Sequence, residues 1–178
     1  MKRYNYTIVC IITVLNIATS CNVDTVTKLS STEKNTIMQS ESMNFASTND
    51  LKPSTVKTYN DLKGVIMTVK DGTITDNKLT LTFANNTKKH CIYGEFFSLE
   101  KKVKECWYRV PVVVKGDYAF NTIGYELPSN GKSEMVVDWN WLYGSLNTGE
   151  YRIIKNVSDF RGTGDYDDYI LAAEFSVP

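Results

Sequence analysis

The sequence predicts an all-β protein, an antiparallel β-sandwich of about seven strands that follows a disordered N-terminal stalk. Two observations lead to this fold class. From residue 62 onward, short runs of alternating apolar and polar residues are separated by turn residues. No stretch of that region has the apolar spacing of a long amphipathic helix.

The first two predicted strands are the most regular in the N-terminal half of the domain. Residues 65–69 carry an apolar side chain at every second position, and Asp71-Gly72 gives the turn that ends this strand. Residues 79–83 alternate leucine and phenylalanine with threonine, and Asn85-Asn86 ends that run.

The next two predicted strands form a hairpin. Residues 90–101 and 106–114 are its arms, and the chain is expected to turn near residues 103–105. Gly94 interrupts the first arm and is a candidate β-bulge.

Three further strands complete the predicted sandwich. Residues 128–131 (Pro-Ser-Asn-Gly) form a turn, and Met135, Val137 and Trp139 then share one face of a strand. Residues 152–157 form another strand. Residues 171–177 alternate strictly, with leucine, alanine, phenylalanine and valine on one face.

A local motif narrows the type of sandwich. Residues 146–151 read Leu-x-x-Gly-x-Tyr and lead into a strand, which is the pattern of a tyrosine corner. In such a corner the hydroxyl of the tyrosine, here Tyr151, bonds to the backbone a few residues upstream. Ile153 stands where an antibody domain has its second cysteine, so apolar packing is expected in place of that disulfide.

The N-terminus has the features of an export signal. A basic start precedes an apolar run over residues 7–18, which is too short to span a bilayer comfortably. Small residues then lead to Cys21, the layout of a bacterial lipoprotein signal in which Cys21 is acylated and becomes the first residue. Ala18 occupies a place where a lipobox usually has leucine, so cleavage to a secreted form and an uncleaved anchor are alternatives.

Three regions are therefore expected: a lipoprotein signal peptide over residues 1–20, a flexible stalk over 21–61 and the sandwich domain over 62–178. The stalk is rich in serine, threonine, asparagine and lysine, and it has too few apolar residues to offset the entropy of ordering. A coil of this length holds a domain about 35 Å from the lipid. The expected location is outside the cytoplasm on the cell membrane, with secretion as the alternative.

Charge excludes several partner classes. The chain of 178 residues has 20 basic and 20 acidic residues, and loss of Lys2 and Arg3 with the leader gives a net charge of −2. Without a basic excess, nucleic acid is not an expected partner, and membrane contact would come from the lipid alone.

Cys91 and Cys106 are the two cysteines that remain in the domain. Export permits a disulfide between them, but a straight hairpin arm would hold them about 30 Å apart, far beyond disulfide reach. A break at Gly94 is the feature that could bring them together.

Residues 79–175 resemble a bacterial immunoglobulin-like domain family that is common in exported Firmicutes proteins. The resemblance rests on residues 93–101 (YGEFFSLEK), 107–111 (WYRVP), 119–125 (AFNTIGY), 137–144 (VDWNWLYG), 149–152 (GEYR), 159–166 (DFRGTGDY) and 171–175 (LAAEF). It implies an immunoglobulin-like sandwich and a non-enzymatic extracellular module, and it transfers no site residues. Phe96 is a departure, because relatives often have proline there.

The sequence offers little chemistry. His90 is the only histidine, so no catalytic triad or zinc site is predicted, and no catalytic residue, metal or cofactor is expected. Asp159, Asp165, Asp167 and Asp168 do not have the spacing of a calcium-binding EF-hand loop. They are interpreted as a solvated hairpin loop in which an arginine pairs with an aspartate.

The predicted function is a lipid-anchored binding or scaffolding module of the cell surface, acting as a monomer on an unidentified protein or glycan. The alternative is an inhibitor or regulator of an extracellular or cell-wall enzyme. Loops at residues 116–124 and 162–168 are the expected contact regions. The candidate recognition residues are Trp141, Tyr143, Arg161, Asp165 and Asp167. Packing at the crossover between the sheets is the competing role for the two aromatic residues.

Overall fold

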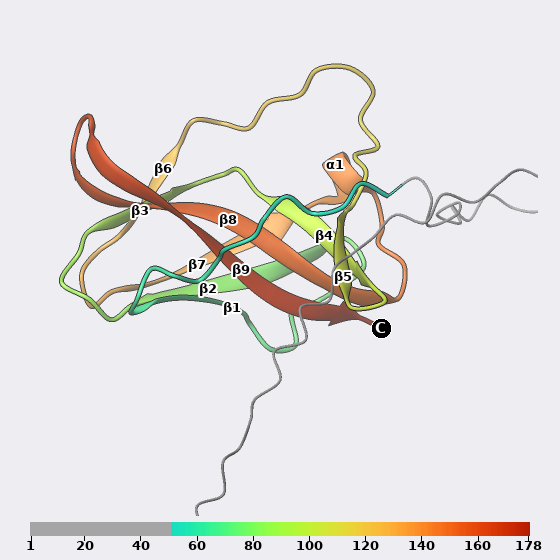
Figure 1. Ribbon diagram of the computed structural model, residues 1–178, viewed down its shortest axis with the longest axis horizontal. Coiled ribbons are helices and arrows are strands. Elements are labelled where there is room, and N and C mark those ends of the chain that lie inside the picture. Colours follow the sequence, from blue (N-terminus) through green and yellow to red (C-terminus); the bar gives the residue numbers. More distant parts are fainter. Residues whose placement is uncertain (1–50) are drawn as a thin grey trace, which may run out of the picture. The chain divides into compact units, whose positions relative to one another are not determined.

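The computed structural model describes residues 51–178, which form nine strands and one short helix (Figure 1). The predicted signal peptide, Cys21 and the first part of the predicted stalk lie outside the described residues. The elements are β1 (Val65–Val69), β2 (Lys78–Asn85), β3 (Cys91–Gly94), β4 (Ser98–Val103), β5 (Cys106–Arg109), β6 (Gly124–Leu127), β7 (Lys132–Asp138), α1 (Asn140–Tyr143), β8 (Gly149–Gly162) and β9 (Asp165–Val177).

The strands form two antiparallel sheets, which confirms the predicted all-β sandwich. The first sheet has the order β1-β2-β7. In the second sheet β8 pairs with β9 on one edge and with both β3 and β4 on the other, and β6 and β5 pair with the outer edges of β3 and β4. The second sheet is therefore one strand wider than the first.

Two of the predicted strands differ from the structure. The arm expected over residues 90–101 is divided into β3 and β4, and the arm expected over 106–114 ends at Arg109, before an irregular connection that reaches β6 at residue 124. The short strand β6 was not predicted. These differences account for nine strands where about seven are expected.

The interruption between β3 and β4 is a bulge at the predicted glycine. Tyr93 pairs with Val157 and Ser98 pairs with Ile154, so β3–β4 holds two more residues than the matching part of β8. The hairpin turn near residues 103–105 is confirmed. Lys104 and Glu105 both have positive φ, 48° and 65°, as a two-residue turn between twisted strands requires.

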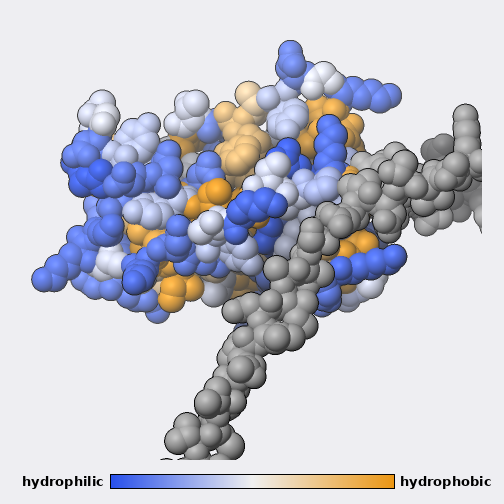
Figure 2. Space-filling view, viewed as in Figure 1, coloured by the Kyte–Doolittle hydropathy of each residue, from blue (hydrophilic) through white to orange (hydrophobic). Residues whose placement is uncertain are grey.

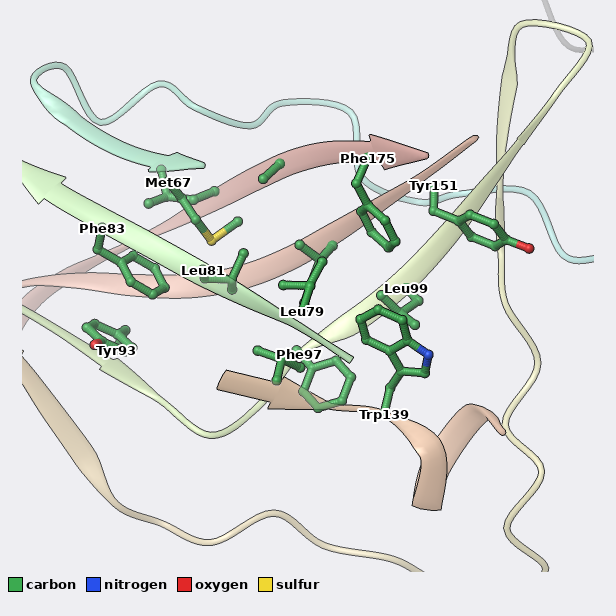
Figure 3. Packing of buried hydrophobic residues seen from close by; sticks show 14 of the residues in the cluster. Met67, Leu79, Leu81, Phe83, Tyr93, Phe97, Leu99, Trp139, Tyr151 and Phe175 are labelled. Carbon is green, nitrogen blue, oxygen red and sulfur yellow. The ribbon is translucent and has the colours of Figure 1, made fainter. Parts of the chain in front are cut away.

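The core lies between the two sheets and is built by their alternating strands. Figure 3 shows side chains from both sheets that point toward one another, among them Leu79, Leu81 and Phe83 of β2 and Leu99 of β4. Trp139 is fully buried and packs on Phe175, with ring centroids 5.7 Å apart. The predicted inward faces of these strands are thus confirmed.

The predicted tyrosine corner is present. The Tyr151 hydroxyl donates to the Asn147 carbonyl oxygen at 2.8 Å, and the side chain is buried. Two residues later Ile153 is completely buried, where apolar packing was expected to replace a disulfide. The corner fixes the chain where it enters β8.

Residues 52–60, which the sequence analysis placed in the stalk, lie on the domain as a belt across the outer face of the second sheet (Figure 1). At one edge the Ser54 amide donates to the Trp107 carbonyl, and the Arg109 amide donates to the Lys52 carbonyl. At the other edge the Asn60 side chain exchanges two hydrogen bonds with the Ala172 backbone, at 2.9 and 3.0 Å, as a paired strand would. The belt therefore covers edges of both β5 and β9.

The belt covers a buried ion pair. Arg152 of β8 and Glu100 of β4 are each 2% exposed and lie 2.6 Å apart. Tyr59 of the belt and Trp107 of β5 both pack on the guanidinium, 4.8 and 4.6 Å from their ring centres. Ser54 accepts a further hydrogen bond from Arg152 at 3.2 Å. The belt thus supplies contacts that a buried cation needs.

This ion pair belongs to a row of alternating charges across four strands. Cross-strand pairing places Glu174 beside Arg152, Arg152 beside Glu100, and Glu100 beside Arg109. Opposite charges at directly paired positions stabilise strand register. The row therefore favours this register of the second sheet over any shifted by one residue.

The two domain cysteines are not joined to each other. Cys91 is a free and fully buried thiol in β3, and burial raises its pKa. Cys106 begins β5 after the hairpin turn, so the bulge at Gly94 does not bring the two together.

We expect removal of either partner of the buried pair to be far more damaging than removal of both. Arg152→Met or Glu100→Leu alone leaves one charge buried and should lower the free energy of unfolding by about 3 to 5 kcal/mol. The double variant should recover much of this loss, as measured by urea unfolding. A double variant as unstable as the sum of the two single variants would contradict this account.

Candidate functional site

The five predicted recognition residues fall into two separate groups. Trp141 and Tyr143 lie in α1, which follows β7. Arg161, Asp165 and Asp167 lie at the tip of the β8–β9 hairpin, which Figure 1 draws at the far left, away from α1. The structure does not bring the two groups together in one site.

The hairpin tip is a paired charge cluster, as the interpretation of the aspartates expected. Arg161 bonds to Asp165 at 2.8 Å and to Asp167 at 3.0 Å, and these carboxylates raise its pKa. Asp159 pairs with Lys89 at 2.5 Å. Within residues 51–178, no group of His, Cys, Asp and Glu is arranged to hold a metal ion.

Tyr143 is part of the core. Its side chain is 5% exposed, its hydroxyl accepts a hydrogen bond from the Leu99 amide at 3.4 Å, and burial raises its pKa. A partner at the surface would therefore not reach it. The packing role, weighed against recognition in the sequence analysis, is the one that the structure gives this residue.

Trp141 belongs to an exposed aromatic cluster, which we define as Phe96, Tyr118, Phe120 and Trp141, with Phe120 in contact with the other three rings. Trp141 is 45% exposed, and its ring lies 6.2 Å from Tyr118 and 5.5 Å from Phe120 in edge-to-face geometry. Phe120 also contacts Phe96 at 5.3 Å and the buried Phe97 at 5.4 Å. The interlocked rings fix Trp141 in place while part of it stays accessible to solvent.

Three parts of the chain build this cluster. The bulge between β3 and β4 carries Phe96, the irregular β5–β6 connection carries Tyr118 and Phe120, and α1 carries Trp141. The Val113 amide donates to the Leu142 carbonyl at 2.8 Å, which ties the connection to α1. Figure 2 shows hydrophobic surface at the top of the view, where Figure 1 draws this connection.

The sequence analysis did not count two exposed members of this surface among the candidate recognition residues. Phe96 is 47% exposed, and Val136 of β7 is 64% exposed. The signal for Phe96 was its departure from the proline of relatives. Val136 had a weaker signal, an apolar residue on the polar face of an otherwise alternating strand.

A groove of about 60 Å³ lies between the aromatic cluster and β7. It is lined by Phe97, by Phe120 and Trp141 of the cluster, and by residues 135–138 of β7. The Glu95 carboxylate also lines the groove and accepts a hydrogen bond from the Tyr125 hydroxyl. Six of the eight lining residues are apolar, and Glu95 and Asp138 are acidic.

Lys155 is a buried charge that the sequence analysis missed. It stands on the inward face of β8, between Ile153 and Val157, where alternation calls for an apolar residue. Its ammonium group donates to the Gly94 carbonyl at the bulge and lies 3.5 Å from the Met135 sulfur. Burial lowers the pKa of Lys155 to about 8.

His90 is half-buried just before β3. The His90 ring packs edge-on against Phe160 at 6.2 Å, and its Nε2 is buried without a hydrogen-bond partner among the residues described.

A family model described as "Bacterial Ig-like domain" matches residues 61–176. No curated protein matches the chain. Among the described residues, no helix is both long enough and apolar enough to cross a membrane.

The buried amine gives a pH-dependent prediction. Lys155 has a pKa near 10.5 in the unfolded chain and a pKa of about 8 in the folded chain. Burying its charge therefore lowers the free energy of unfolding by the full amount below pH 8, and this loss vanishes as the pH rises above 10.5. We expect Lys155→Met to raise the free energy of unfolding by about 1 to 3 kcal/mol at pH 7. This advantage over the wild type should shrink between pH 8 and pH 10.

Urea unfolding of both proteins across this pH range measures the effect. Lys78→Met, which removes an exposed lysine of β2, is the matched control and should show no such convergence with the wild type. If Lys155→Met keeps a constant difference from the wild type at every pH, the buried amine is not the source of the pH dependence.

Proposed function

Since the chain belongs to the bacterial Ig-like domain family, we propose that it is a cell-surface binding or scaffolding module held to the membrane by lipid on Cys21. Family membership supports an extracellular, non-catalytic domain. The leader over residues 1–20 and the cysteine that follows support the lipid anchor. The stalk would hold the domain away from the membrane, where its loops can meet a partner.

The binding surface we propose is the aromatic cluster around Trp141. The observation that carries this proposal is the partial exposure of Trp141, 45%, on a scaffold of rings that fixes its position. Tryptophan and tyrosine on rigid elements bring large contact area with little loss of side-chain entropy, which is why they dominate binding interfaces. The hairpin tip is a weaker candidate because its charges already pair with one another.

Trp141→Ala tests the surface, and Tyr166→Ala is the matched control. Tyr166 is 51% exposed at the hairpin tip, so the control removes an equally exposed aromatic ring elsewhere. We expect Trp141→Ala to weaken retention of the purified protein on isolated cell-envelope material by at least about tenfold, with Tyr166→Ala close to the wild type.

The amount retained is measured after washing, and urea unfolding checks that both variants are folded. Equal retention of all three proteins would remove the aromatic cluster as the binding surface.

The anchor has its own test. Cells that express the full chain are labelled with an alkyne-bearing fatty acid, and we expect label on the wild type and none on Cys21→Ala. The variant should also leave the membrane fraction. Persistence of the label in Cys21→Ala, or an unlabelled wild type in the culture medium, would rule out lipid attachment at this residue.

A further inference from the structure

One edge of the first sheet is left unpaired beside the aromatic cluster. In the part of the chain that the structure describes, β7 pairs with β2 alone. The Trp139 amide donates to the Asn77 carbonyl and the Asn85 amide donates to the Gly131 carbonyl, which fixes the alternation of the ladder. The odd-numbered residues of β7 therefore bond to β2.

The even-numbered residues of β7 consequently direct their backbone N–H and C=O groups away from the sheet. These residues are Lys132, Glu134, Val136 and Asp138. Their side chains are exposed, and no backbone hydrogen bond to these groups is found within residues 51–178. A free edge of this length is a template for another strand.

The unequal width of the sheets leaves room for one strand at this edge. β1 lies against β9, and the Tyr93 hydroxyl of β3 lies 2.5 Å from the Ser133 hydroxyl of β7. Within the described residues the first sheet ends at β7, whereas the second sheet continues with β6, which contacts the end of β2, and with β5. A folded second copy would bring its own wider sheet into the same space, which favours a single extended segment as occupant.

The groove and its charges define the chemistry of that segment. An added strand would direct alternate side chains toward the groove between Phe120 and β7, whose lining residues are mostly apolar. Its other side chains would lie beside the outer face of β7. There Glu134 is already paired with Lys70 at 2.8 Å, whereas Asp138 has no cationic partner among the described residues. A basic residue opposite Asp138 is therefore favoured.

We propose that β7 receives an extended polypeptide segment of a partner protein as an additional strand, with alternating apolar and basic side chains. The apolar side chains enter the groove next to Trp141, and the backbone pairs with Glu134, Val136 and Asp138. This inference rests on the proposed function, since it names the class of ligand for the same surface. Binding by strand addition draws affinity from the backbone and specificity from the pocket.

The test uses the full chain and a fluorescent nine-residue peptide that alternates valine and lysine, with fluorescence anisotropy as readout. A second peptide has the same sequence but carries N-methyl groups on its lysines. In the proposed complex these residues lie opposite Glu134, Val136 and Asp138, so methylation removes the donors that face β7. We expect saturable binding of the first peptide and at least tenfold weaker binding of the methylated one. Because the protein is unchanged, this comparison does not depend on the folding of a variant.

Val136→Pro is the matching change in the protein. The N–H of Val136 points away from β2, so proline removes an edge donor without removing a bond of the β2–β7 ladder. Val136→Thr is the control that changes the side chain and keeps the donor. We expect Val136→Pro to weaken peptide binding at least tenfold and Val136→Thr to stay within about threefold of the wild type.

The outcomes separate this inference from the proposed function. Absence of saturable binding, or equal binding of the methylated peptide, overturns strand addition. If Trp141→Ala then still abolishes retention on envelope material, the aromatic surface stands and its ligand is not an extended polypeptide. Dimers of the wild type that disappear in Val136→Pro would instead show that a second copy occupies this edge, and would overturn the proposal.

Discussion

The fold depends on β8, a strand that is buried on both faces. Its inward residues Tyr151, Ile153 and Val157 meet the core, while outward Arg152 is covered by the belt. Every other strand of the second sheet is attached to β8 directly or through β3 and β4. A strand in this position needs its start fixed and its charges satisfied. The tyrosine corner fixes the start of β8. The row of alternating charges provides a partner for Arg152, and the Gly94 carbonyl at the bulge accepts a hydrogen bond from Lys155.

The belt makes the segment before the sandwich a structural part of it. Residues 52–60 cross the second sheet from β5 to β9, bond to both edges, and close the site of the buried Arg152–Glu100 pair. Unpaired sheet edges promote unwanted association, and here two of them are covered by the chain's own backbone. Any pull on the N-terminus of the domain would act first on these contacts, because they precede the first core strand.

The unpaired edge of β7 makes one side of the sandwich different from the other. The narrower first sheet ends at β7, next to a cluster of rings held by the bulge, the β5–β6 connection and α1. These features lie together because the bulge that divides β3 from β4 turns Phe96 outward, while Phe97 remains in the core. The described residues thus present a shaped aromatic surface and free backbone groups side by side, the two features on which the proposed binding rests.

The sequence by itself determined the sheet class, most strand positions, the hairpin turn, the tyrosine corner and the inward face of the last strand, because each depends on local alternation or on turn residues. Only the tertiary structure decided which aromatic residues are exposed: Trp141 and Tyr143 are two positions apart, yet one is at the surface and the other in the core. The tertiary structure also determined that residues 52–60 pack on the second sheet, that Lys155 is buried and that one edge of β7 is free. The physical reason is that these features follow from which segments cover one another, and a polar run such as residues 52–60 carries no periodic signal of the sheet that it will cover.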